Sequence, residues 1–463
     1  MFIGRKSELS NLNQRYEKNQ FEFDCIYGRR RVGKTELIKE FIKDKKAIFY
    51  TGLNDTYATN LSSFSSAVYN ALYSTENTDV VYKDFEEIFR VVHEAASREK
   101  LILVIDEFPY IAKKFGGILS LLQRDIDHKF SKTNLFLILC GSSASFMENQ
   151  VLSEKSPLFG RRTGQHKLLP FNYYEAAAFF PGFSDEEKAI AFAVCGGMPK
   201  YLKLFNDEYS IEKNLADIFF TPESVLYEEA YNLLNQEVNE PALYNAVITA
   251  IATGSSNFNK IADKAHIENS LCAQYIKALI DMGIVKKEIP FGEKETSRKT
   301  IYRLNDGMFR FWYRFIHKNR SLIELRRGDI VFSKTKPFIS DFMGEAFEQI
   351  CKDYMWKVND GTTLPIEFRD IGRWWGNNPI KKCEQEIDLI AVDWDDKKAI
   401  FCECEWTNEL VPESVINGLI DKASMFNFED KYYFIFSKSG FTEAAIKRGS
   451  DSDRIRLIVF KDM

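Results

Sequence analysis

Short apolar runs alternate with amphipathic stretches through the first third of the chain. The run Phe23–Tyr27 precedes a glycine-rich turn, and Glu36–Phe41 then shows the apolar spacing of a helix. Two further runs, "KLILVID" and "NLFLILCG", are continuously apolar, as in strands that a parallel sheet buries on both faces. The pattern therefore predicts an α/β domain with a parallel sheet over residues 1–169.

Apolar positions recur at helical spacing from 170 to 240, which predicts a helical segment. Residues 241–330 then show a helix, a break, a short helix, a turn, a longer helix and two strands around a polar hairpin. This order is the layout of a winged helix-turn-helix. Two interpretations stay open: DNA binding, for which Lys294, Arg298 and Lys299 of the hairpin are the better candidates, and a rigid spacer or protein contact.

The stretch "FRFWYRFIHKNRSLIELRR" interleaves basic and aromatic residues. Exposed aromatic rings beside basic side chains would suit nucleic-acid binding. Helical spacing instead favours a buried aromatic face with a basic rim, because arginine stems can cover apolar surface. A more polar stretch, Asp329–Lys336, separates this region from a last unit, 338–463.

The last unit begins with a helical pattern and continues into a hairpin, "CEQEIDLIAVDWDDKKAIFCECEW". If Asp395 and Asp396 form a two-residue turn, Asp388 faces Glu403, whereas a four-residue loop places it opposite Glu405. In both registers the three carboxylates share one face of the hairpin. Because close carboxylates repel unless water screens them or a cation lies between them, this face is either a solvated strand face or a site for Mg²⁺ or Mn²⁺.

Composition restricts the class of protein. The 463 residues, 45% hydrophobic and 28% charged, have the balance of a folded chain with more than one domain. The net charge of −5 means that any nucleic-acid surface must be local. There is no apolar run of the roughly 20 residues that a membrane span needs, and no signal-peptide core. With eight scattered cysteines as well, we expect a cytoplasmic protein without a membrane partner.

The turn after Phe23–Tyr27 has the phosphate-loop pattern of Gly28, four residues, Gly33, Lys34 and Thr35. Its glycines let successive backbone N–H groups surround phosphate oxygens at a helix amino terminus. Lys34 would neutralise the β- and γ-phosphates of ATP, and the Thr35 hydroxyl would ligate Mg²⁺. The predicted loop residues are Gly28, Arg29, Arg30, Arg31, Val32, Gly33, Lys34, Thr35 and Glu36.

Two later strands carry polar residues at their carboxyl ends. Asp106 ends the run "KLILVID" and is a predicted Mg²⁺ ligand, while Glu107 is placed to orient an attacking water. Ser142 follows the run "NLFLILCG", where it would either sense the γ-phosphate or cap the next helix.

Four segments, "FIGRKSEL", "IYGRRRVGKTELI", "VIDEFPYI" and "SPLFGRRTG", together resemble the archaeal-type ATPases of the AAA+/STAND group over 2–171. The resemblance implies that the helical segment is a lid over the nucleotide. It implies that Arg161 or Arg162 acts on the γ-phosphate, from the same subunit or from a neighbour in a homo-oligomer. The segment near the adenine would be Ile3, Gly4 and Arg5.

The last unit resembles the PD-(D/E)XK nuclease-like domain. The resemblance makes Asp388 and Glu403 counterparts of the metal ligands, with Glu345 or Glu348 as the helical carboxylate. Glu405 stands where that family has lysine.

Three consequences of this departure stay open. Either Glu405 is an additional metal ligand, or Lys422 supplies the missing positive charge, or the domain has lost catalysis.

The sequence thus predicts an α/β protein made of a P-loop ATPase core, a helical lid, a winged helix-turn-helix and a restriction-endonuclease-like domain. The expected boundaries are 1–169, 170–240, 241–330 and 338–463. The predicted function is an ATP-hydrolysing switch coupled to a domain that acts on DNA or RNA. The alternative is an ATP-regulated binding or signalling protein with an inactive last domain and a protein partner. The candidate catalytic residues are Glu107, Arg161, Arg162, Asp388, Glu403 and Glu405.

Overall fold

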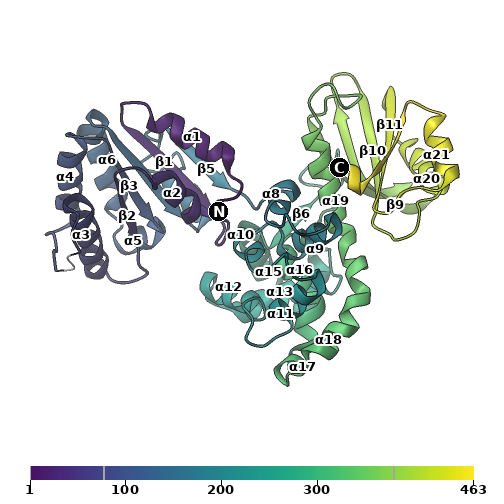
Figure 1. The fold of residues 1–463 in the computed structure, drawn as a ribbon, viewed down its shortest axis with the longest axis horizontal. Helices are drawn as coiled ribbons and strands as arrows, with labels where there is room; N and C mark the ends of the chain where they lie inside the picture. Colours follow the sequence, from purple (N-terminus) through teal and green to yellow (C-terminus); the bar gives the residue numbers. More distant parts are fainter. Residues whose placement is uncertain (1, 77–78, 379–380) are drawn as a thin grey trace. The chain divides into compact units, whose positions relative to one another are not determined.

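The computed structural model describes residues 2–76, 79–378 and 381–463. The chain forms two compact units, drawn in Figure 1. Unit 1 comprises residues 1–170 together with Met198–Lys200, and unit 2 comprises Phe171–Gly197 together with Tyr201–Met463. None of the described helices combines the length and the apolar character that crossing a membrane requires.

Unit 1 is built on a five-stranded sheet in the order β2-β3-β4-β1-β5, in which every neighbouring pair is parallel. This confirms the predicted α/β architecture. The strands are β1 (Glu22–Gly28), β2 (Ala47–Thr51), β3 (Leu101–Asp106), β4 (Leu135–Gly141) and β5 (Gly164–Leu168). The helices are α1 (Lys6–Tyr16), α2 (Lys34–Ile42), α3 (Tyr57–Tyr73), α4 (Phe85–Ala96), α5 (Phe108–Lys114), α6 (Ile118–His128) and α7 (Ala144–Phe146).

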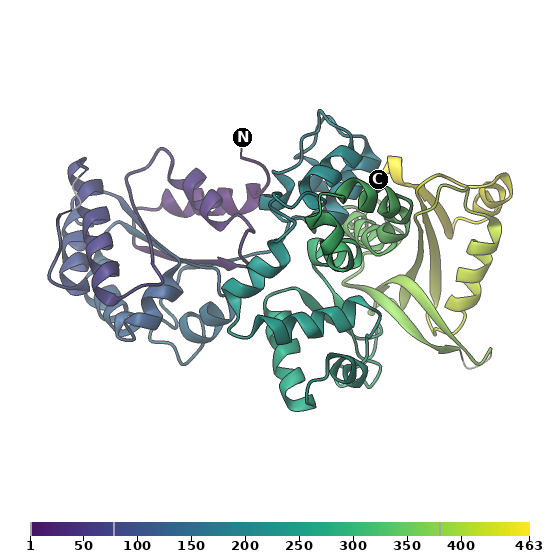
Figure 2. The same cartoon turned by 90° about the horizontal axis from the view of Figure 1, so that it is seen from below.

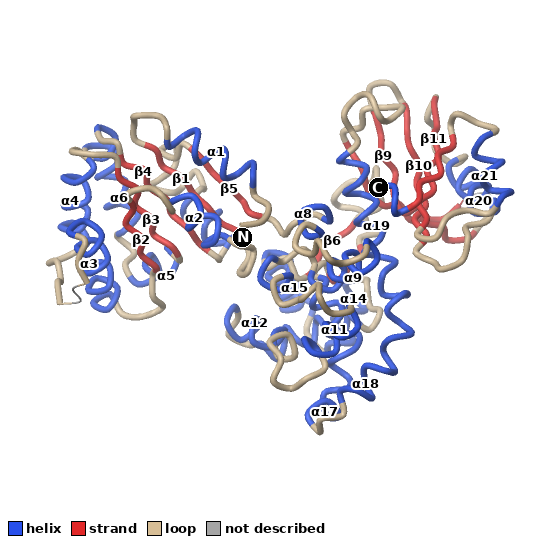
Figure 3. Tube along the Cα trace, in the orientation of Figure 1, coloured by secondary structure: helices blue, strands red, loops and turns tan. Residues whose placement is uncertain are grey.

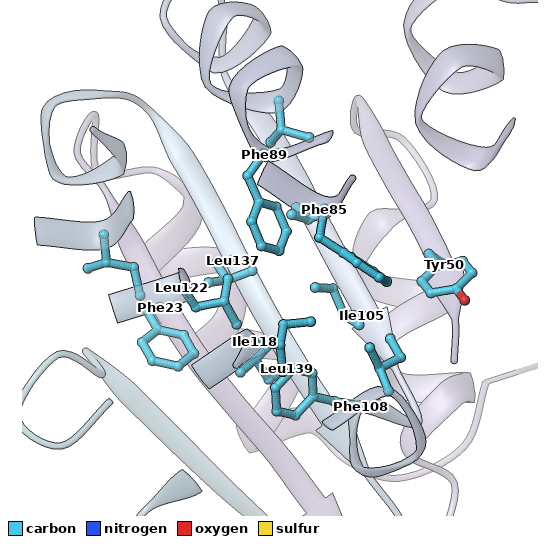
Figure 4. Close-up of a cluster of buried hydrophobic side chains, with 14 of the residues drawn as sticks. Phe23, Tyr50, Phe85, Phe89, Ile105, Phe108, Ile118, Leu122, Leu137 and Leu139 are labelled. Atoms are coloured by element: carbon cyan, nitrogen blue, oxygen red, sulfur yellow. The ribbon is translucent and has the colours of Figure 1, made fainter. Parts of the chain in front are cut away.

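Helices cover both faces of this sheet. On one face, side chains of β1, β3 and β4 pack against α3, α4 and α6 in a single apolar core, part of which Figure 4 shows. On the other face, Phe41 of α2 packs against Phe136 of β4, with ring centroids 5.4 Å apart. Because β1, β3 and β4 are fully buried, their carboxyl ends form a rigid edge that carries the polar residues described below.

Unit 2 begins with a helical region and contains a small antiparallel pair, β6 (Val285–Glu288) and β7 (Ile301–Leu304). Helices α13, α14 and α15 precede this pair in the expected order, and their assignment as a winged helix stays a prediction. The helices before the last sheet are α8 (Tyr173–Ala177), α9 (Asp185–Cys195), α11 (Ile211–Phe219), α12 (Glu229–Glu237), α13 (Pro241–Ala252), α14 (Phe258–Ala265), α15 (Asn269–Asp281), α16 (Gly307–Phe311), α17 (Arg320–Glu324) and α18 (Gly328–Thr335). A short helix, α10 (Pro199–Leu202), spans the last change of unit along the chain.

The aromatic residues of the stretch from Phe309 onward are buried. Trp312 and Phe311 are 0% exposed, and Phe315 is 6% exposed. Arg310 lies at the edge of this cluster and forms an ion pair with Glu345. The interpretation as a core with a basic rim is therefore right, and nucleic-acid binding by these rings is excluded.

The last part of unit 2 is a mixed sheet in the order β12-β11-β10-β9-β8, whose strands Figure 3 shows in red. Helix α19 (Ile339–Lys357) contacts β9 and β10. Helices α20 (Glu413–Ala423) and α21 (Glu443–Ser450) pack with the strands in an apolar core, and they follow one face of the sheet in Figure 2. The strands are β8 (Asp370–Asn378), β9 (Cys383–Asp393), β10 (Lys398–Glu405), β11 (Asp430–Ser437) and β12 (Ile455–Val459).

The hairpin register settles the alternative left open by the sequence. β9 and β10 pair from Asp393 opposite Lys398 down to Leu389 opposite Cys402, so the next position sets Asp388 beside Glu403. A bulge in the pairing of β8 with β9 lies at the same place: Asp388 and Leu389 both oppose the single residue Arg373. A β-bulge changes the direction in which the side chain of the bulged residue points.

Candidate functional site

The predicted phosphate loop joins the carboxyl end of β1 to the amino end of α2. Gly28 has φ 150°, and a Cβ added there would lie 2.3 Å from the backbone oxygen of Leu168. Gly33 has φ 92° and forms the amino-terminal cap of α2. Both positions need glycine, because side chains are disfavoured at these angles and Gly28 also has no room for one. The loop therefore approaches the sheet closely and ends at a helix amino terminus.

Lys34 is buried, with 6% of its surface exposed. Its ammonium group donates to the carbonyl oxygens of Gly28 and Arg29, at 2.9 Å each. Burial lowers its pKa, while the nearby Asp106 and Glu107 act in the opposite direction. A buried cation held by backbone oxygens in a glycine-bounded loop fits a phosphate group better than it fits a packed core.

Four further residues predicted for the nucleotide site come together at the same sheet edge: Thr35, Asp106, Glu107 and Ser142. The Thr35 hydroxyl donates to the Asp106 carboxylate at 3.0 Å, which joins the two predicted Mg²⁺ ligands. The Ser142 hydroxyl donates to Glu107 Oε2 at 2.7 Å, and its backbone N–H donates to the same oxygen at 3.3 Å. The structure therefore places Ser142 as a partner of Glu107.

Arg5 also contacts this loop. Its guanidinium group donates to the Val32 carbonyl at 3.2 Å and to the Leu169 carbonyl. Arg5, Arg31 and Glu107 have positive φ values of 54°, 72° and 48°. Non-glycine residues keep this conformation only where the surrounding structure fixes it, and such residues cluster at functional sites.

The remaining residues predicted for the nucleotide lie at the surface of the same region. Arg30 donates to the Tyr110 hydroxyl, Glu36 is exposed in the first turn of α2, and Gly4 has φ 73°. Ile3 and Arg29 are half-buried.

The two predicted arginine fingers lie elsewhere. β5 is parallel to β1, and its first residue, Gly164, pairs with Asp24, so the backbone of Arg161 and Arg162 lies at the amino edge of the sheet, away from the phosphate loop. Arg161 binds both oxygens of Asp127, at 2.7 and 2.8 Å, and Arg162 donates to the Leu152 carbonyl. Arg161 is thus engaged in an ion pair within its own chain, and the action of either arginine on a γ-phosphate stays a prediction.

In unit 2, Asp388 and Glu403 form the centre of a carboxylate cluster. Asp388 is 9% exposed and accepts the Cys404 N–H at 2.8 Å. Burial raises the pKa of Asp388 to about 6, although the Cys404 N–H and Arg373 act to lower it. Burial, followed by repulsion from Asp388, raises the pKa of Glu403 to about 7. Burial and mutual repulsion thus disfavour the charged forms of both carboxylates, and a cation at the cluster would offset this effect.

A lysine does reach this cluster, from a helix. Lys422 of α20 donates to both carboxylate oxygens of Glu403, at 3.0 and 3.1 Å. Glu405 lies two residues further along β10 and raises the pKa of Glu403. Of the three consequences of the missing strand lysine, the contacts favour the second, in which Lys422 supplies the cation.

The structure also distinguishes the two candidate carboxylates on α19. Glu345 is held by Lys286, Arg303 and Arg310, at 3.1 to 3.5 Å. Glu348 instead lies near the cluster: burial and then the Asp388 charge raise its pKa to about 7. Glu348 is therefore the helical member of the cluster.

The cluster fits one kind of metal site only. Among the described residues, no group of three or more His, Cys, Asp or Glu side chains is arranged to hold a metal ion. Asp388 and Glu403 fit a Mg²⁺ ion of the type that one or two carboxylates hold and that keeps water and substrate phosphate as its other ligands. Lys422 is a competing cation at Glu403.

Two known families match parts of the chain. Residues 2–205 match a family described as an ATPase domain predominantly from Archaea, and residues 312–416 match a family described as Archaea bacterial proteins of unknown function. The second match includes Asp388 and Glu403 and ends before Lys422.

A relative that matches nearly the whole chain identifies the family to which the chain belongs. The uncharacterized protein MJECL04 of Methanocaldococcus jannaschii is 32% identical over 445 residues, which cover 95% of this chain and 96% of that protein. The chain belongs to the same family, and its amino-terminal part is an ATPase domain of the predominantly archaeal type.

Two other similarities are more limited. The uncharacterized ATP-binding protein MJ0423 of the same organism is 50% identical over 46 residues, 10% of this chain and 78% of that protein. The structure of the Aeropyrum pernix ORC2 protein covers 72% of this chain and 95% of its own, at 14% identity and a TM-score of 0.42. This structural likeness is too low to transfer a function.

Proposed function

We propose that the chain is a Mg-ATP-hydrolysing switch whose last domain cleaves or holds nucleic acid. The observation that carries the first half is the convergence of Lys34, Thr35 and Asp106 at one edge of the sheet. Lys34 would bind the β- and γ-phosphates, while Thr35 and Asp106 would hold Mg²⁺. Such an ion would supply positive charge to the phosphates. Glu107, held by Ser142, would orient the attacking water.

Nucleotide binding tests this half directly. We expect Lys34→Ala to weaken the binding of Mg-ATP by at least about 100-fold, because the variant loses a buried, charge-assisted contact to phosphate. Isothermal titration with a non-hydrolysable ATP analogue measures the change. Lys39→Ala is the matched control, since Lys39 is exposed on the same helix. Equal affinity in the Lys34 and Lys39 variants would contradict the assignment of the loop.

The second half rests on the carboxylate cluster. Asp388 and Glu403 would hold a divalent cation, which polarises the phosphate and lowers the pKa of a bound water. Lys422 orients Glu403 and brings positive charge to the site, and Glu348, with its raised pKa, is suited to exchange a proton near pH 7. This arrangement supports hydrolysis of a phosphodiester.

A second candidate function keeps the ATPase but makes the last domain a binding module. The observation in its favour is the Lys422 ammonium on both oxygens of Glu403, together with a carboxylate, Glu405, at the position of the family lysine. Such a domain would hold nucleic acid or a protein without cleaving it.

One assay separates the two candidates. Labelled single- and double-stranded DNA and RNA are incubated with the protein under Mg²⁺ or Mn²⁺, beside Asp388→Asn and the exposed control Glu429→Gln. We expect cleavage by the wild type and by the control, and at least about a 100-fold loss in Asp388→Asn. Absence of cleavage in every condition selects the binding module, and equal cleavage by both variants removes Asp388 from the mechanism.

A further inference from the structure

A cleft of about 760 Å³ opens within unit 2, between the predicted winged helix and the last sheet. One wall is formed by the start of α14 and the segment before β7, with Asn257, Lys260, Arg298 and Lys299. The other wall is the β8–β9 pair, including Arg373, Trp375 and Glu386. The functional sites described above do not include this cleft.

The cleft lining holds four basic residues and two carboxylates, Glu384 and Glu386, and thus a local excess of two positive charges in a chain whose net charge is −5. Arg373 is neutralised by Glu386, at 2.5 Å. Lys299 has a partner outside the lining residues, Glu293, at 2.7 Å. Within the described part of the chain, Lys260 and Arg298 form no ion pair. A phosphate backbone would supply the missing counter-charges.

The two walls are fixed to each other. The Phe291 N–H donates to the Arg373 carbonyl at 2.8 Å, and the Phe291 ring stacks on Trp394 with centroids 6.0 Å apart and an angle of 11°. The cations of β6 and β7, Lys286 and Arg303, surround Glu345 of α19. The cleft is therefore part of the folded unit.

Its dimensions and its aromatic residue limit the occupant. Trp375 lines the wall and is partly exposed, with the Arg373 guanidinium 6.0 Å from its ring centroid. Bases of a single strand stack on such rings, whereas the bases of a duplex are already stacked inside it. A volume of about 760 Å³ suits a few nucleotides of one strand.

Arg373 connects the cleft to the carboxylate cluster. Its Nε lies 3.9 Å from the Glu348 carboxylate, and its charge acts to lower the pKa of Asp388. Arg373 is also the residue that faces the bulge at Asp388. A strand seated in the cleft would thus have its backbone next to the cluster.

We propose that this cleft binds a single-stranded segment of nucleic acid, with Lys260 and Arg298 on its phosphates and Trp375 stacked on a base. The inference rests on the proposed nucleic-acid role of the last domain, and it holds whether or not that domain cleaves.

Fluorescence anisotropy of a labelled single-stranded oligonucleotide, with full-length protein in EDTA, tests the proposal without cleavage. We expect Arg298→Ala and Lys260→Ala each to reduce the slope of log K against log salt by about 0.7, as expected for one phosphate contact to a single strand. Trp375→Ala should weaken binding by about tenfold, and Trp375→Phe should retain most of the affinity. Lys447→Ala, an exposed position on α21, is the control and should change neither quantity.

Equal affinity of all variants, binding that does not depend on salt, or tighter binding of a duplex than of a single strand would each overturn the proposal. If only the proposed cleavage is wrong, the result differs from these outcomes: single-strand binding would still depend on Arg298 and Trp375, but no substrate would be cut.

Discussion

The ion cluster around Glu345 supports a quantitative prediction about unit 2. Burial acts to raise the pKa of Glu345, but Arg310, Arg303 and Lys286 outweigh it and hold the pKa at about 2, against an ordinary value of 4.5. A shift of this size corresponds to about 3 kcal/mol of stability at neutral pH. Glu345→Gln keeps the shape of the side chain and removes the charge, so we expect unit 2 to lose about 3 kcal/mol.

Tryptophan fluorescence can follow this loss in the intact chain, because all six tryptophans belong to unit 2. They are Trp312, Trp356, Trp374, Trp375, Trp394 and Trp406. Urea unfolding at pH 7 compares the wild type with Glu345→Gln. The control is Glu429→Gln, which breaks a 3.3 Å ion pair between side chains that are 67% and 71% exposed, and should change stability by less than about 0.5 kcal/mol.

The depressed pKa of Glu345 also predicts the direction in which the stability difference changes with pH. Because the folded pKa of Glu345 is depressed, its contribution is complete above the unfolded value of 4.5 and is lost as the pH falls toward about 2. The stability difference between wild type and Glu345→Gln should therefore fall by about 40% between pH 7 and about pH 3.5. Other carboxylates titrate in both proteins and cancel in the difference. Equal urea midpoints at pH 7, or a difference that grows as the pH falls, would refute the reasoning.

Two further predictions concern unit 1. Gly28→Ala should destabilise it by more than about 2 kcal/mol, because the new Cβ would lie 2.3 Å from the Leu168 oxygen; a circular-dichroism melt with an unchanged Tm would contradict that contact. Glu107→Gln should keep Mg-ATP affinity and lower the rate of phosphate release by at least about 100-fold, since glutamine still accepts from Ser142 but takes no proton; undiminished turnover would remove Glu107 from the mechanism.

The sequence predicts well those parts of the molecule that depend on local pattern. The strand before the phosphate loop, the strand ending at Asp106 and the strand before Gly141 are continuous apolar runs, and each is a fully buried strand of the sheet. The same pattern predicts the loop, because the order of strand, glycine-rich turn and helix places Lys34 and Thr35 at the start of the helix. The hairpin was predicted with its two alternative registers, and one of them is observed.

The parts that sequence reasoning missed depend on contacts between distant segments. Glu345 and Glu348 are indistinguishable by spacing, because both face inward from one helix, and only the packing of β6 and β7 against α19 separates them. Lys422 was one of three alternatives for the missing cation, and because it lies 19 residues from Glu403, only the packing of α20 shows that the two side chains meet. The bulge at Asp388 cannot be predicted from the amino-acid composition of the strand. For the same reason the cleft, whose walls are over 70 residues apart in sequence, has no sequence signature.

The change of unit at Met198–Lys200 links the nucleotide site to the rest of the chain. These three residues belong to unit 1, where a Cβ on Gly33 would lie 3.6 Å from the Pro199 ring, whereas the residues on both sides belong to unit 2. Gly196 and Gly197, with φ 60° and 69°, end α9 immediately before them. The chain therefore passes between the two units on both sides of these three residues, one of which lies beside the phosphate loop.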